Sequence, residues 1–129
     1  MKHPPKISEA ELEIMSLLWE CGTPMTAAQI CEELMQRLDW GQSTVKTLLS
    51  RLYQKGAITR GKSAGGGVYH YTPLISQRDY GRESADRLIG KIFGGSAKDL
   101  VASLFEDDKL TKEDIEELKA MWDDRTKEE

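Results

Sequence analysis

Cysteine is scarce in this 129-residue chain, and long apolar runs are missing. The two cysteines, Cys21 and Cys31, are too few for a disulfide framework and are not in C-x-x-C spacing, so we expect buried, reduced thiols. No apolar run approaches the roughly 20 residues that a membrane-spanning helix needs. The N-terminal segment also lacks the apolar stretch of a signal peptide. These absences predict a cytoplasmic protein with no direct membrane association.

The chemistry-bearing patterns of enzymes are also missing. We find no nucleophile–base pair and no metal-ligand spacing, and neither His3 nor His70 has a ligand cluster around it in the sequence. Gly65-Gly66-Gly67 precedes a β-prone run, whereas a phosphate-binding loop would lead into a helix through Lys and Ser or Thr. The sequence therefore predicts no catalytic residue, no metal and no cofactor.

Acidic residues are absent from Trp40 to Tyr71, although the whole chain has a net charge of −4. Residues 1–72 hold 8 Lys and Arg against 7 Asp and Glu, and the remainder holds 10 against 15. Because the charge is segregated, the acidic total does not exclude a nucleic-acid partner. The acid-free stretch contains five cations, which are Lys46, Arg51, Lys55, Arg60 and Lys62.

Three amphipathic helices are predicted after a polar lead-in over residues 1–7, which we expect to be frayed. Ser8 and Glu11 form a capping box for the first helix, which Gly22 and Pro24 end near Glu20. Thr26 and Gln29 form the same box for the second helix, which stops around Asp39. Ser43 is expected to cap the third, and Gly56 to end it after Lys55. The apolar positions expected to be buried in the second and third helices are Ala27, Ile30, Cys31, Leu34, Leu38, Val45, Leu48, Leu49 and Leu52.

Two β-prone runs follow the third helix, at residues 57–60 and 68–72. The glycine-rich segment 61–67 between them predicts a flexible turn, so the pair forms a hairpin. Tyr69 and Tyr71 share a strand face and are expected to pack on the helices, and Trp40 to pack under the third helix. The predicted fold class is mainly α with a small β-hairpin: a winged helix-turn-helix domain over residues 1–73. We interpret its third helix as a DNA-reading helix and the hairpin as its wing.

Residues 74–129 predict three more helices, capped by Ser76, Ser96 and Thr111, with a solvated tail from Asp123 onward. So short a helical segment cannot bury its apolar faces alone, which predicts a three-helix dimerisation domain. The candidate dimerisation residues are Tyr80, Leu88, Ile92, Phe93, Leu100, Val101, Leu104, Phe105, Ile115, Leu118 and Trp122.

Five segments carry a resemblance over nearly the full length: ISEAELEIMSLLW, WGQSTVKTLLSRLYQKGAI, YHYTPLIS, FGGSAKDLVASLF and LTKEDIEEL. In this order and spacing, the chain resembles the BlaI/MecI/CopY family of bacterial repressors. The resemblance implies an N-terminal winged helix, C-terminal helices that interlock in a homodimer, and a double-stranded operator with a TACA/TGTA-type dyad.

By position, the resemblance places the helix at residues 43–55 in the major groove and the wing at residues 58–72 beside it. Lys46 and Arg51 are candidates for guanine edges or phosphates, and Thr44 and Thr47 for phosphates or a thymine methyl. The alternative is the solvated face of an ordinary surface helix. The full candidate set for DNA binding is Ser43, Thr44, Lys46, Thr47, Arg51, Lys55, Arg60 and Lys62, with the last two contacting phosphates or the minor groove.

The resemblance also bears on regulation. Copper-responsive members carry a C-terminal C-x-C cluster, and this chain has no cysteine after Cys31, so copper sensing is not expected. β-Lactam-responsive members are cut at an Asn-Phe bond that aligns with Ser103-Leu104, where the Asn is missing. Cleavage by a membrane sensor protease stays a hypothesis, and Leu104 and Phe105 are assigned first to the dimer core. A small-ligand- or redox-responsive regulator is the main alternative, and a winged-helix protein-interaction module is a further one.

Overall fold

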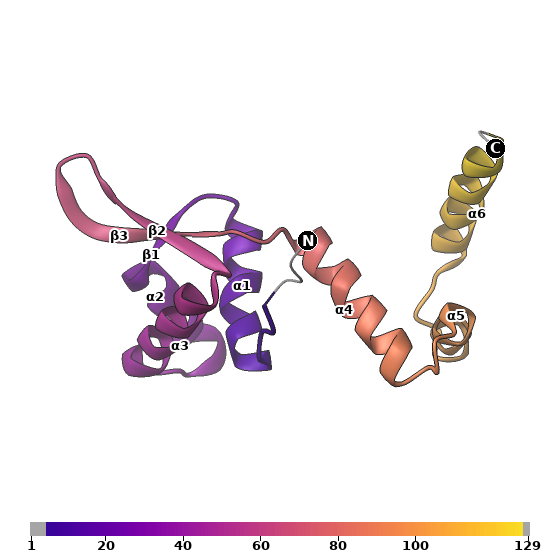
Figure 1. Ribbon diagram of the computed structural model, residues 1–129, viewed down its shortest axis with the longest axis horizontal. Helices are drawn as coiled ribbons and strands as arrows, with labels where there is room; N and C mark the ends of the chain where they lie inside the picture. The colour runs from indigo at the N-terminus through magenta and orange to yellow at the C-terminus, as the bar shows by residue number, and fades with distance from the viewer. Residues whose placement is uncertain (1–4, 128–129) are drawn as a thin grey trace. The chain divides into compact units, whose positions relative to one another are not determined.

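The computed structural model describes residues 5–127, which divide into two units between Ser84 and Ala85. The fold class is confirmed: helices dominate, with one small antiparallel sheet (Figure 1). His3 and most of the lead-in lie outside the described residues. The elements in chain order are α1 (Glu9–Cys21), β1 (Met25–Thr26), α2 (Ala27–Leu38), α3 (Gln42–Lys55), β2 (Ile58–Ser63), β3 (Gly66–Pro73), α4 (Gln77–Lys91), α5 (Ala97–Glu106) and α6 (Lys112–Lys127).

Local capping signals account for most of the helix boundaries. The predicted capping boxes of Ser8 with Glu11 and Thr26 with Gln29 are both formed. α3 differs, because its N-cap is Gly41 and Ser43 lies inside the first turn. The earlier start lets the amide of Val45 donate to the carbonyl of Gly41 at 3.3 Å, and the helix begins without a side-chain cap.

The sheet has the order β1-β3-β2, with both pairings antiparallel. β1 is a two-residue strand that the sequence analysis missed, and it pairs Met25 with Tyr71. The hairpin turn is tighter than the expected segment 61–67, since Ser63 already pairs with Gly66. Gly66 and Gly67 have φ angles of 87° and 98°, a left-handed conformation that favours glycine at this irregular point in the hairpin.

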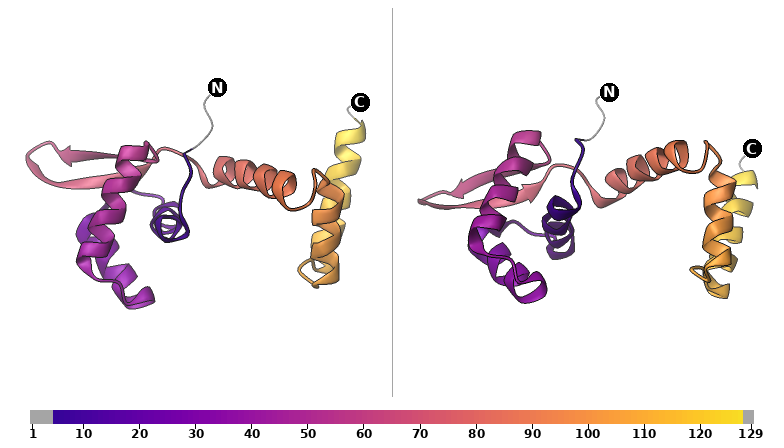
Figure 2. Two further views of the ribbon diagram at one scale, coloured as in Figure 1. Left: turned by 60° about the horizontal axis from the view of Figure 1, so that its bottom comes forward. Right: turned by 90° about the horizontal axis from the view of Figure 1, so that it is seen from below.

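α1, α2, α3 and the sheet lie next to one another in the N-terminal unit (Figure 2), and its core lies between them. Ile7 is buried, so the end of the lead-in belongs to the core and is not frayed. Cys31 is buried as expected, but Cys21 is exposed because it lies at the last turn of α1, where its thiol contacts Thr23. Leu38 is likewise exposed, because α2 ends there, and Trp40 packs against the core from a half-buried position.

In the C-terminal unit, α5 and α6 lie side by side (Figure 2). Ser96 caps α5, and Thr111 forms a capping box with Asp114 ahead of α6, as predicted. α6 continues to Lys127, so the segment from Asp123 is the last part of a helix, where we expected a separate tail. Residues 128–129 of that tail lie outside the described range. No side chain from 85 to 127 is buried.

Candidate nucleic-acid interface

The outer face of α3 is polar and open to solvent. Four buried residues, Val45, Leu48, Leu49 and Leu52, fix the helix against the core. Because these four share one face, the residues between them are turned outward. The predicted contact residues Ser43, Thr44, Lys46, Thr47 and Arg51 are all exposed on this helix.

The cations of α3 and of the wing strand β2 have no counter-ion among the described residues. Among residues 5–127, no Asp or Glu forms an ion pair with Lys46, Arg51, Arg60 or Lys62. Acidic side chains would repel phosphates and compete for these cations, so their absence leaves the positive potential of the face intact. The arrangement can neutralise a polyanion.

Lys55, for which we predicted a DNA contact, forms intramolecular hydrogen bonds at the surface. Its Nζ donates to Oε1 of Glu11 at 2.5 Å and to the carbonyl of Lys6 at 2.9 Å. Glu11 also accepts from the backbone N–H of Ser8 at 2.9 Å, so its carboxylate links the start of α1 to the end of α3. No local pattern predicts this pair, since the two residues are 44 positions apart.

The carboxylate of Glu11 is only 2% exposed, and its Oε2 has no hydrogen-bond partner within residues 5–127. Burial by itself raises the pKa of Glu11, but the hydrogen bonds from Lys55 and Ser8 and the positive charge of Lys55 outweigh burial, so the pKa lies below its ordinary value. The charged form is therefore the one that the fold stabilises.

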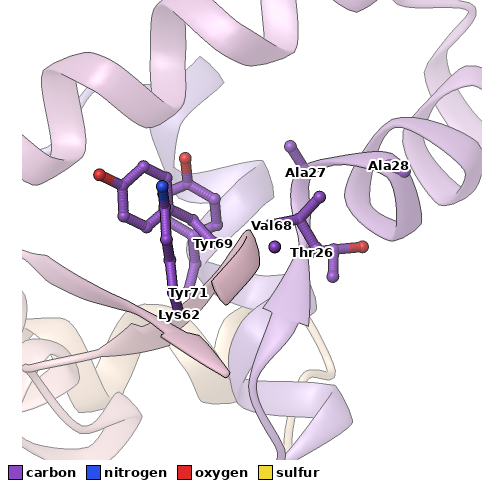
Figure 3. A pocket seen from close by; sticks show the side chains of 8 residues that line it. Thr26, Ala27, Ala28, Lys62, Val68, Tyr69 and Tyr71 are labelled. Carbon is purple, nitrogen blue, oxygen red and sulfur yellow. The ribbon is translucent and has the colours of Figure 1, made fainter. Parts of the chain in front are cut away.

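Aromatic rings surround the cations at the base of the wing. Cζ of Arg60 lies 4.0 Å from the ring centre of Tyr53 on α3 and 4.3 Å from that of Tyr69 on β3. Nζ of Lys62 lies 4.9 Å from the ring centre of Tyr69, and its side chain runs beside the two wing tyrosines (Figure 3). Tyr71 is buried in the core as expected, but Tyr69 stays partly exposed and contacts the cations. Tyr53 was not predicted as a residue of this site, because nothing in the sequence pattern of α3 distinguishes it from the other outward-facing residues.

A cleft of about 320 Å³ separates the wing from the start of α2. The residues that line it are Thr26, Ala27, Ala28, Lys62, Gly67, Val68, Tyr69 and Tyr71 (Figure 3). Val68 exposes most of its side chain on this side of the hairpin.

The candidate dimerisation residues divide between the two units. Tyr80 is buried in the core of the N-terminal unit, with its ring centre 6.1 Å from that of Trp19, whose Nε1 donates to the carbonyl of Ile75. The remaining candidates belong to the C-terminal unit, where Ile92 is 69% and Trp122 is 66% exposed. A cleft of about 370 Å³ runs between α5 and α6, lined by Val101, Phe105, Leu110, Ile115, Leu118, Lys119, Trp122 and Asp123.

The candidate cleavage bond lies within a regular helix. Ser103 and Leu104 are half-buried in α5, and Oγ of Ser103 donates to the carbonyl of Leu100 at 2.8 Å. A protease binds its substrate in an extended conformation, so this bond is closed to cleavage until α5 unwinds locally.

The described residues form neither a metal site nor a membrane-spanning helix. No group of three His, Cys, Asp or Glu side chains there is arranged to hold a metal ion. No helix within residues 5–127 is both long enough and apolar enough to cross a bilayer.

Three helices, an exposed and acid-free third helix, and an adjoining hairpin define a winged-helix DNA-binding protein. Comparison with known proteins identifies which kind. The family model described as penicillinase repressor matches residues 7–124. The penicillinase repressor of Bacillus licheniformis is 34% identical over 118 residues, which cover 92% of this chain and 90% of that protein.

Two further relatives agree with this assignment. The methicillin resistance regulatory protein MecI of Mammaliicoccus sciuri is 33% identical over 114 residues, covering 88% of this chain and 90% of that protein. The solution structure of monomeric Bacillus licheniformis BlaI in complex with the blaP half-operator is 38% identical. It matches with a TM-score of 0.53 and covers 62% of this chain and 94% of that one. The chain belongs to the penicillinase repressor family, and it is a DNA-binding transcriptional repressor and not an enzyme.

Proposed function

We propose that this repressor binds a near-palindromic operator of TACA/TGTA type as a homodimer in the cytoplasm, and blocks transcription from it. The observation that carries the proposal is the exposed, acid-free face of α3 in a winged helix that is similar to BlaI bound to its half-operator. α3 would lie in the major groove, and the wing would follow the backbone beside it.

α3 would read the base sequence of the operator, and the wing would add affinity through the DNA backbone. Arg51 and Lys46 present their charges on the outer face of α3, where a guanidinium can bind both acceptors of a guanine edge. Ser43, Thr44 and Thr47 supply hydroxyls for phosphates or a methyl contact near the start of the helix. Arg60 and Lys62 on β2 would contact phosphates, which carry no sequence information of their own. Lys55 is left out of this set, because Glu11 engages its ammonium.

Dimerisation would come from the C-terminal unit. Its large apolar residues are exposed to solvent, and a second copy would cover them. A symmetric dimer presents two reading helices about 34 Å apart or a multiple of that, and so requires a dyad in the DNA. Tyr80 is assigned to the N-terminal core, and the interface is assigned to the residues after Ala85.

Release from the operator would follow an inducing signal that acts on the C-terminal unit. Cleavage at Ser103-Leu104 by a membrane sensor protease would cut the interface helix α5 and so weaken the dimer. A small ligand that binds the cleft between α5 and α6 is the second candidate, favoured by the apolar lining of that cleft. Immunoblotting during induction separates the two, since an uncut chain that leaves its promoter would exclude cleavage.

The DNA-binding assignment is tested by competition. We expect Arg51→Ala to remove most of the preference for the operator over scrambled duplex, by about tenfold or more, because a bidentate base contact is lost. Arg60→Ala should weaken both duplexes by the same factor. Equal loss of preference in the two variants would contradict the role given to Arg51.

A further inference from the structure

The base of the wing joins three elements through one guanidinium. Arg60 comes from β2, and the two rings beside it come from α3 and β3. The strand register explains the contact on the sheet. Arg60 pairs with Tyr71 and Lys62 pairs with Tyr69, so all four side chains share one face of the hairpin, and Tyr69 is the diagonal neighbour of Arg60.

The rings lie at the surface and the guanidinium is partly enclosed between them. Tyr53 is 41% and Tyr69 is 38% exposed, whereas Arg60 is half-buried. Ring faces attract the flat faces of a guanidinium through their quadrupole. The five N–H donors of arginine lie in its plane, so they remain available at the edge of the group.

No carboxylate pairs with Arg60 among the residues that the structure describes, and the sequence has none between Trp40 and Tyr71. A planar fork of donors matches the two non-bridging oxygens of a phosphodiester and binds them with two parallel hydrogen bonds. A free arginine loses rotamer entropy on making such a contact, and one that is already held loses less.

We propose that Arg60 is a preorganised bidentate ligand for one phosphate of the DNA backbone, and that Tyr53 and Tyr69 are the positioning residues that hold its guanidinium. The proposal rests on the proposed function, in which α3 and the wing face the DNA. It also gives the wing its angle, because Tyr53 belongs to the reading helix and Tyr69 to the wing. Lys62 has one ring neighbour and acts as a more mobile point charge.

The first test measures the affinity of the full chain for operator and scrambled duplexes over a range of NaCl concentrations. Arg60→Ala should weaken both by about tenfold. It should also reduce the magnitude of the log–log salt slope by about one unit per protomer, because one phosphate contact is lost. Arg60→Lys should keep the slope and recover only part of the affinity, since an ammonium binds without the fork.

The second test separates positioning from packing. Tyr53→Leu and Tyr69→Leu should each weaken binding about two- to fivefold, while Tyr53→Phe and Tyr69→Phe, which keep the ring, should bind like the wild type. Placed on the Arg60→Ala background, the same leucine substitutions should have no further effect. Tyr53→Gln provides a second ring-free variant with a side chain suited to an exposed helical position, and thermal melts identify any variant that has lost its fold.

Three results would overturn the proposal. One is an unchanged salt slope in Arg60→Ala, which would leave Arg60 a structural role alone. Another is an equal loss of DNA affinity from Tyr53→Leu in the wild type and on the Arg60→Ala background, which would mean that the ring contributes to binding independently of Arg60. The third is a loss confined to the operator, which would indicate base reading in the minor groove. Failure of the proposed function is distinct, since the wild-type chain would then show no preference for any dyad.

Discussion

The two units of this chain use similar helices in opposite ways. In the N-terminal unit, α1, α2 and α3 turn their apolar faces toward one another and the sheet closes the core, so that Leu52 and Ile14 are fully enclosed. In the C-terminal unit, α5 and α6 have similar patterns and sound caps, yet no side chain from 85 to 127 is buried. Amphipathic pattern and capping therefore specify helices, but they do not specify what the apolar face packs against.

The two units also differ in their size and in their secondary-structure elements. The N-terminal unit, Met1–Ser84, includes a three-stranded sheet that packs against α3 and helps to close its core. The C-terminal unit is smaller, and its described residues, 85–127, contain no strand. In the homodimer proposed above, a second copy would cover its exposed apolar residues, and its stability would then depend on protein concentration.

The largest expected effect comes from a charge placed on the exposed apolar face of the C-terminal unit. Trp122→Asp should dissociate the proposed dimer to single chains of 14.6 kDa in sedimentation equilibrium, because it would put a carboxylate into the core of the proposed interface. Operator affinity should fall by about 100-fold, since the two half-sites are no longer bound together. Glu117→Gln, on the same helix, is the matched control. A Trp122→Asp chain that still sediments as a dimer would place the interface elsewhere.

The next largest effect is a difference in the unfolding free energy that is lost when a leucine of each unit is replaced by alanine. Leu52→Ala leaves a cavity at a position that is 0% exposed and should cost about 3 kcal/mol of unfolding free energy. Leu118→Ala should cost under about 0.5 kcal/mol, provided that the chain is kept monomeric by dilution or by Trp122→Asp. Urea titrations followed by circular dichroism give both values. Similar costs at the two sites would mean that the C-terminal unit has a closed core of its own.

A smaller effect is expected from the ion pair that links α1 to α3. Lys55→Met should cost about 2 kcal/mol, less than for a fully buried pair because Lys55 is 35% exposed. The pKa of Glu11 is lowered by folding, so its contribution is complete above the ordinary value near 4.5 and is lost as the pH falls through and below it. Acid titration of Glu11→Gln should therefore show a shallower loss of stability in that range. An acid profile unchanged from that of the wild type would argue against a charged Glu11. A reduced salt slope of DNA binding in Lys55→Met would show that Lys55 contacts a phosphate, contrary to its assignment here.

Features that depend on neighbours in the sequence were predictable here. The capping boxes of Ser8 with Glu11 and of Thr111 with Asp114 span three residues, and both were expected. The fold class followed from helical spacing and the hairpin signal. The site was harder, because Lys46 and Arg51 could be placed on the outer face of α3 while their contacts with DNA remain a prediction.

Long-range partners were not predictable by the same means. Glu11 was expected only as a cap, and its second role with Lys55 depends on how α1 crosses α3. Tyr80 has the spacing of an interface residue, but the strand that precedes it brings its ring to Trp19. Cys21 fits a buried thiol by residue type, and its exposure depends on where the last turn of α1 falls. In each case a tertiary contact overrides a local pattern.

Thr26 has two structural roles: it pairs with His70 in the sheet, and its side chain caps α2. Insertion or loss of a single residue within the Met25-Thr26 connection into α2 would therefore have to break one of the two, since a shift of one position turns every strand side chain to the opposite face. The two-residue tip of the hairpin carries no such double constraint. Length variation among related chains is consequently expected at the tip of the wing, and the short connection that leads into α2 is expected to keep its length.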